Sequence, residues 1–113
     1  MQGVPFRVDG QGRVLISWMS RQRAYWSVSE AGAKRFRARV ASPDGKPDEA
    51  FPIAVANPQG EILLVWKQGK TVHWAVYHAD GRFTGQRGRA GELPGNNKPT
   101  AVVGADGTFY VVF

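Results

Sequence analysis

The chain has 113 residues, of which 42% are hydrophobic, so it is long enough for one ordinary core and too apolar for a disordered chain. It has no cysteine, which excludes disulfides and thiolate metal sites. Its formal net charge of +6 favours an anionic partner, although such a charge is also typical of a soluble surface with no specific partner. Its apolar runs are far shorter than the ~20 residues of a transmembrane helix, so we expect no membrane span.

A short segment that begins with proline recurs along the chain. Pro5, Pro52 and Pro99 stand 47 positions apart, and each begins a short segment that favours a β-strand and is followed by a turn. We align these three prolines and place a single-residue length difference inside the first turn. An apolar run that ends in an aromatic residue comes next, and in two copies a second tryptophan lies eight positions later. The first copy has Gly12, the apolar run 14–18 and Trp26. The second copy has Gly60, the run 62–66 and Trp74, and the third has Gly107 and the run 109–113.

Each copy predicts a series of short antiparallel strands. In the second copy, a first strand begins at Pro52, a second covers 62–66 and a third covers 71–77. In the first copy, the third strand covers 23–29 and a more polar fourth strand covers 35–40. Side chains alternate between the faces of a strand. We therefore expect Ile62, Leu64 and Trp66 on one face opposite Leu63 and Val65, and Val72, Trp74 and Val76 opposite Thr71, His73, Ala75 and Tyr77.

Turn signals separate these strands. The first and second strands of the copies are joined by turns at Asp9-Gly10, Asn57-Pro58 and Asp106-Gly107, and the third and fourth strands by turns at Ala31-Gly32 and Asp80-Gly81. The basic segment Gly85–Gly91 lacks the ending of a phosphate-binding loop, so we interpret it as a flexible loop between sheets.

This pattern predicts an all-β fold of antiparallel, four-stranded, propeller-type blades. The boundaries are 5–51 and 52–98 for two blades and 99–113 for a partial one, which makes about two and a half blades. A closed propeller needs at least four blades, so we expect the chain to be part of a larger propeller. Two alternatives stay open: copies of the chain assemble into a ring, or the fold is an unrelated small barrel or sandwich.

The stretch Ala75–Phe83 supplies a family resemblance. It contains Asp80, Gly81 and Phe83, and the order of phrases around it resembles the Asp-box (BNR) repeats of sialidase-like propellers. The family box has Ser or Thr, then Asp, Gly, Thr and an aromatic residue, and here the spacing is altered. The resemblance covers nearly the whole chain as a blade pattern. It implies stacked blades and a periplasmic or secreted location.

The candidate ligand-binding residues are basic and aromatic. Arg35, Arg37 and Arg39 alternate along the predicted fourth strand, about 7 Å apart on one face, a spacing that suits phosphates or acidic sugars. The alternative is a charged edge strand that prevents pairing with other chains. Tyr25 and Tyr77 are the candidate stacking platforms, whereas the repeated tryptophans are expected to pack between blades.

No catalytic motif is present, and we predict no metal and no cofactor. His73 and His78 are five positions apart in the predicted strand, so they point to opposite faces and cannot share a metal ion. The favoured function is a non-catalytic propeller segment that binds an anionic glycan or a protein through the loops at the blade ends. Its remaining blades come from the same or another chain. The alternatives are a fragment of a sialidase-like glycoside hydrolase and, less favoured, a basic nucleic-acid-binding β-domain.

Overall fold

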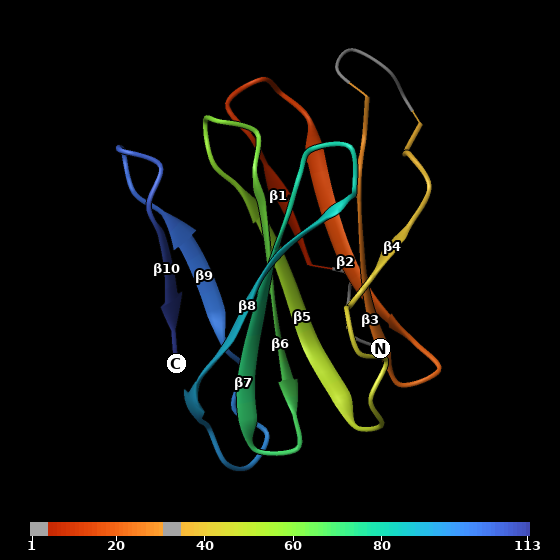
Figure 1. The fold of residues 1–113 in the computed structure, drawn as a ribbon, viewed down its shortest axis with the longest axis vertical. Coiled ribbons are helices and arrows are strands. Elements are labelled where there is room, and N and C mark those ends of the chain that lie inside the picture. The colour runs from red at the N-terminus through yellow and green to blue at the C-terminus, as the bar shows by residue number, and fades with distance from the viewer. Residues whose placement is uncertain (1–4, 31–34) are drawn as a thin grey trace.

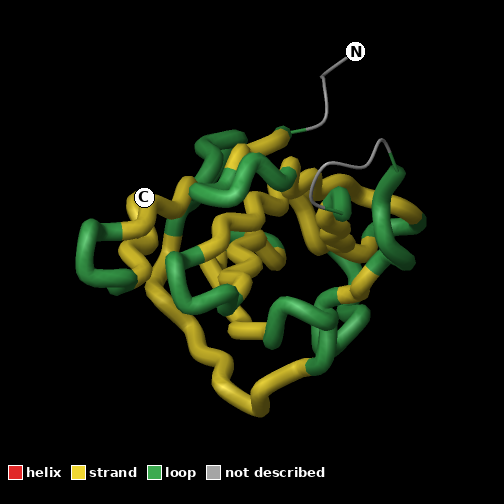
Figure 2. Tube along the Cα trace, turned by 90° about the horizontal axis from the view of Figure 1, so that it is seen from above, coloured by secondary structure: helices red, strands yellow, loops and turns green. Residues whose placement is uncertain are grey.

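The computed structural model describes residues 5–30 and 35–113, and within these ranges it contains β-strands and no helix (Figures 1 and 2). Within each sheet, strands that follow one another in the sequence pair antiparallel. The prediction of an all-β fold with four-stranded antiparallel sheets is therefore confirmed. Among the described residues no sheet closes on itself into a barrel.

Two four-stranded sheets follow one another along the chain, and a hairpin comes after them. Short turns between strands favour this sequential order. The first sheet contains β1 (Phe6–Val8), β2 (Val14–Ser20), β3 (Arg23–Val28) and β4 (Val40–Ala41). The second contains β5 (Glu49–Ala56), β6 (Ile62–Gln68), β7 (Thr71–Tyr77) and β8 (Phe83–Glu92). The hairpin contains β9 (Thr100–Val103) and β10 (Phe109–Val112).

The first turn of each sheet, and the turn of the hairpin, has the same hydrogen bond. The amide of Gly12 donates to the carbonyl of Asp9 (3.1 Å), Gly60 to Asn57 (3.0 Å) and Gly107 to Gly104 (2.9 Å). The three glycines have φ of +77°, +86° and +89°, a backbone region that residues with a Cβ rarely adopt. The repeat seen in the sequence is thus a repeat of local backbone geometry.

Apolar side chains cover both faces of the second sheet. One core lies between the first and second sheets and includes Leu15, Trp26, Leu64 and Trp66. A second core lies between the second sheet and the hairpin, and Ala101 belongs to it. The expected face assignment of 62–66 and 71–77 is confirmed, because each alternating set lies in a different core. The set on the first core includes Ile62, Leu64, Trp66, Ala75 and Tyr77, and the set on the second includes Leu63, Val65, Val72, Trp74 and Val76.

The fourth strand of the first sheet differs from the prediction of 35–40. It is limited to Val40–Ala41, and an isolated bridge joins Phe36 to Ser29 before it. The amide of Arg37 donates to Val28 and its carbonyl accepts from the hydroxyl of Ser27, so the backbone departs from a regular ladder there. The prediction that Arg35, Arg37 and Arg39 share one face of a regular strand was therefore wrong. The predicted turn at Ala31-Gly32 lies outside the described residues.

The prediction of a flexible loop at Gly85–Gly91 was also wrong, because this segment lies within the strand β8. Gly88 pairs with Trp74, and a Cβ there would come within 2.7 Å of the indole ring. Glycine thus allows the outer strand to pass over a bulky ring on its neighbour. Glycine-rich composition indicated a loop only because the sequence does not show this close approach.

Strand pairing also shifts the alignment of the first copy by one residue. The carbonyl of Pro5 accepts from the amide of Ser17, and Arg7 pairs with Leu15 as Val55 pairs with Leu63. Pro5 therefore corresponds in position to Ile53, next to Pro52, and no length difference remains between the two copies from Pro5 to Trp26. Pro52 lies inside β5 at a bulge, where its missing amide hydrogen breaks no regular ladder.

Candidate functional site

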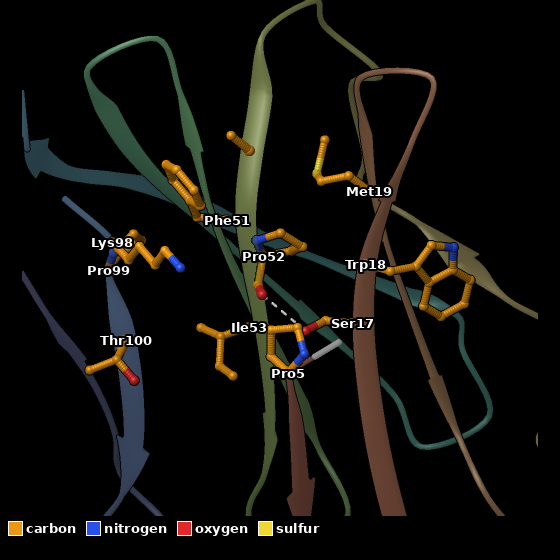
Figure 3. Close-up of a pocket in the computed structure, with 11 residues that line it drawn as sticks. Pro5, Ser17, Trp18, Met19, Phe51, Pro52, Ile53, Lys98, Pro99 and Thr100 are labelled. Carbon is orange, nitrogen blue, oxygen red and sulfur yellow. Dashed lines mark hydrogen bonds between the residues drawn. The ribbon is translucent and has the colours of Figure 1, made fainter. Parts of the chain in front are cut away.

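A pocket of about 630 Å³ lies where β1, β5 and β9 begin (Figure 3). This volume is within the range of small-molecule sites. Most of its lining is apolar, and the three repeated prolines all contribute to it. The apolar lining includes Pro5, Met19, Phe51, Pro52, Ile53 and Pro99, and the polar lining includes Ser17, Lys98 and Thr100. The pocket therefore lies between the starts of three strands that are far apart in the sequence, each the first strand of its sheet or hairpin.

The backbone of β5 is strained at this pocket. Phe51 has φ +52°, a left-handed conformation that is uncommon for an aromatic residue, and the register shifts between Ala50 and Ile53. The bulge gives Pro52 a place in the strand and turns the ring of Phe51 toward the pocket (Figure 3). Bulges and strained backbone recur next to binding sites, where they re-aim a side chain.

Lys98 provides the positive charge of the pocket. Its ammonium lies 5.4 Å from the ring centroid of Phe51, within the range of a cation–π contact. Among the described residues that line the pocket, no side chain is acidic. The buried Lys67 stabilises the backbone just before Lys98. Its ammonium donates to the carbonyls of Gly95 (2.7 Å) and Asn97 (3.1 Å). A negatively charged group is thus favoured at the rim, above apolar walls.

Of the basic and aromatic candidates, the structure brings Tyr25 and Arg39 together. The guanidinium carbon of Arg39 lies 4.4 Å above the ring centroid of Tyr25. Tyr25 in turn stacks on Trp18, with centroids 5.8 Å apart and planes at 20°. Arg35 is exposed and lies 3.9 Å from the carboxylate of Glu30, whereas Arg37 donates to the carbonyl of Ala79 (3.3 Å). These three arginines therefore do not form one anion-binding row.

Tyr77 lies in the core between the two sheets. It is 2% exposed, its ring contacts Trp26 edge-on with centroids 5.5 Å apart, and its hydroxyl donates to the carbonyl of Ala41 (2.9 Å). Burial raises the pKa of the Tyr77 hydroxyl above its usual range. No ring face is free for a ligand, so the candidate site does not include Tyr77. Its place on the same face as Ala75 and Leu64 is the sequence signal for this burial.

The two histidines do not meet. His73 is half-buried on β7 and stacks on Trp66 with centroids 5.8 Å apart, whereas His78 is exposed after the end of β7. Within residues 5–30 and 35–113, no group of three or more His, Cys, Asp or Glu side chains could hold a metal ion. Burial lowers the pKa of His73, and the nearby Arg87 adds to this effect.

Sequence reasoning missed two features of this molecule. The first is the pocket around Phe51 and Lys98, for which the repeated proline positions were the available signal. The second is an ion pair between the sheets, in which the guanidinium of Arg87 donates two hydrogen bonds to the carboxylate of Asp44. These two residues are 43 positions apart, and no local pattern relates them.

Comparison with protein-family models, with curated proteins and with solved structures found no match to this chain. In the part of the chain that the structure describes, there is no helix long and apolar enough to cross a membrane.

Proposed function

We propose that the chain is a non-catalytic segment of propeller-type repeats that binds an anionic glycan in the pocket at the start of its inner strands. The single observation that carries this proposal is the described lining of the pocket, which has apolar walls, one lysine at the rim and no acidic side chain. The chemistry suits a ring with an apolar face and one negative group, as in an acidic sugar residue. The net charge of +6 would also attract such a ligand over longer distances.

The packing of the sheets supports the propeller-type arrangement in this proposal. Successive four-stranded sheets have the same strand order, and the second buries both faces against its sequence neighbours. Propeller blades stack in this way around an axis, with the inner strands most deeply covered. The beginnings of β1, β5 and β9 would then lie close to that axis, at one end of the blades.

The absence of acidic residues from the described lining favours binding over hydrolysis. Glycoside hydrolysis by the common mechanisms needs two carboxyl groups on opposite sides of the scissile bond. Ser17, the hydroxyl in the wall, is occupied because it donates to the carbonyl of Pro52 (3.0 Å). The pocket can therefore hold and orient an anion without a group that would cleave it.

The test is calorimetric titration of the 113-residue chain with acidic sugars, such as a uronic acid or a sialic acid, and with neutral sugars of the same size. We expect saturable binding of an acidic sugar only. Replacement of the charge in Lys98→Gln should weaken it about tenfold, because a charge-assisted hydrogen bond is lost. Phe51→Ala should also weaken it. Lys46→Gln and Phe83→Ala, which change exposed residues outside the pocket, are the matched controls.

Three outcomes would contradict the proposal. Equal binding of neutral and acidic sugars would remove the role of Lys98, and binding that survives both pocket variants would place the site elsewhere. Binding of an acidic peptide but of no sugar would assign the pocket to a protein partner.

A further inference from the structure

No other sheet among the described residues covers one face of the first sheet, although the inner part of the equivalent face of the second sheet is buried. On β6, Ile62, Leu64 and Trp66 are 1%, 0% and 0% exposed, because the first sheet lies against them. The corresponding residues on β2 are Val14, Ile16 and Trp18, and all three are only partly buried. Phe6 and Val8, which pair with Ile16 and Val14, are both 62% exposed. We call these five residues, with Tyr25 and Arg39, the open face.

The two faces carry the same pair of stacked rings. Trp18 pairs with Tyr25 across β2 and β3, as Trp66 pairs with His73 across β6 and β7. The ring centroids are 5.8 Å apart in both pairs, and the planes meet at 20° and 18°. The open face is thus built to the same geometry as a face that a neighbouring sheet buries.

An arginine stands at the same place beside each ring pair. Arg39 directly precedes Val40, the partner of Trp26, and Arg87 directly precedes Gly88, the partner of Trp74. On the buried face, Arg87 donates to both carboxylate oxygens of Asp44, one at 2.6 Å. Asp44 belongs to the connection between β4 and β5, so the sheet that covers this face also supplies the counter-charge. On the open face, Arg39 rests on Tyr25 and remains exposed.

We propose that the open face receives a further four-stranded sheet of the same repeat, whose connection after its outer strand presents a carboxylate to Arg39. This inference rests on the repeat stacking of the proposed function but not on the ligand of the pocket. The occupant follows from the structure, because the equivalent face is covered by such a sheet through its apolar side and its Asp44. One contact would not be repeated, since Ser29 stands where Tyr77 donates to Ala41.

A second copy of this chain would satisfy the open face less well. Apart from the open face, which carries Arg39 itself, its exposed apolar side chains include those of the hairpin, where Val102, Tyr110 and Val112 are 49%, 52% and 49% exposed. That hairpin has no third or fourth strand among the described residues, and hence no connection that could bring a carboxylate to Arg39. The apolar surfaces could meet, but the charge of Arg39 would stay unpaired.

The test is a tandem chain in which residues 5–52 are repeated directly ahead of Pro5, a spacing that matches the observed register. We expect the added sheet to raise the midpoint of thermal unfolding by about 5 °C or more. Asp44→Asn in the added copy and Arg39→Gln in the original copy should each lower this midpoint. The midpoint of the double variant should be no lower than that of either single variant, because both substitutions remove the same ion pair. In the 113-residue chain, Arg39→Gln should lower the midpoint less than in the tandem chain, because there it removes only the contact with Tyr25.

A second tandem chain has a short Gly-Ser linker at the junction. It distinguishes a loss of stability caused by a strained junction from one caused by poor packing between the two sheets. The proposal is overturned if neither tandem chain gains stability, if the two substitutions add independently, or if Arg39→Gln has the same effect in the 113-residue chain. Sedimentation of the 113-residue chain provides a further check, and we expect a monomer. Concentration-dependent association that Trp18→Thr abolishes would assign the open face to a second copy instead.

Discussion

Asp44 accepts two hydrogen bonds from the guanidinium of Arg87, and this pair joins the outer edges of the two four-stranded sheets. The carboxylate follows β4 and the guanidinium lies on β8. Both side chains are about one-third exposed, at 28% and 34%. The geometry is the two-pronged pairing that arginine makes with a carboxylate, which adds directional preference to the attraction of opposite charges.

We predict that Asp44→Asn lowers the free energy of unfolding by about 0.5–1 kcal/mol at neutral pH, because a partly exposed pair contributes little more. The hydrogen bonds from Arg87 lower the pKa of Asp44 below its usual value. The carboxylate therefore stabilises the fold above its unfolded pKa of about 4, and this contribution disappears as the pH falls through the folded pKa. Urea unfolding at pH 7 and pH 3 measures both effects. Asp48→Asn, in the same connection, is the control, and an equal loss in that variant would contradict the prediction.

His73 gives a second pH dependence. Because burial lowers its pKa in the folded chain, the unfolded chain binds the proton more readily. Stability should be complete above the unfolded pKa of about 6.5 and should decline as the pH falls below it. His73→Gln should remove this decline between pH 7 and pH 5, while His78→Gln, at an exposed position, should leave it in place. A decline of unchanged size in His73→Gln would mean that another group causes it.

The hydrogen bonds of Thr71 indicate which ring nitrogen of neutral His73 carries the proton. Its hydroxyl donates to the carbonyl of Gln68 (2.8 Å), and its oxygen lies 2.9 Å from Nε2 of His73. Since the single hydroxyl proton is already used, Nε2–H must donate to Thr71. Nitrogen NMR of the imidazole at pH 8 should therefore report the Nε2–H tautomer, and the Nδ1–H tautomer would contradict this network.

The close approach of Gly88 to Trp74 predicts a large cost for one methyl group. In Gly88→Ala the new carbon would lie 2.7 Å from two indole atoms, so the outer strand or the ring must move. We expect a loss of about 1–3 kcal/mol in urea unfolding, as for other overpacked positions. Gly10→Ala is the matched control, because a Cβ at Gly10 meets nothing within 4 Å, and its effect should stay within about 0.5 kcal/mol. Similar values for the two variants would exclude strain at Gly88.

The turn between β2 and β3 offers a stabilising change. Its two central residues, Arg21 and Gln22, have φ of +51° and +66°, as a two-residue hairpin turn of type I′ requires. Glycine adopts this conformation without the steric cost of a Cβ, so Gln22→Gly should raise the free energy of unfolding by about 0.5–1 kcal/mol. Gln11→Gly, in a turn position without positive φ, should not stabilise. Thermal unfolding of both variants decides the matter, and a loss of stability in Gln22→Gly would be the contrary result.

The alternation of side chains was enough to place residues on the correct faces. Leu63 and Leu64 are neighbours in the sequence and lie in different cores, as the two-residue period of a strand demands. The turns could also be predicted from the sequence, because Gly12, Gly60 and Gly107 adopt a backbone conformation that few other residues tolerate. In contrast, Gly85–Gly91 was assigned to a loop, since a glycine required by the ring of a neighbouring strand looks the same in the sequence as one required by a turn.

The sequence by itself determined that the chain forms short antiparallel strands with two distinct faces, because these properties depend on residues two to ten positions apart. Only the tertiary structure decided what each face meets. Trp18 and Trp66 occupy the same position in their copies, yet one is partly open and the other is buried. Asp44 and Arg87 form a pair, and Phe51 and Lys98 form a pocket rim, because the sheets stack and bring distant segments together. Such contacts depend on the packing of whole sheets, which local side-chain patterns permit but do not specify.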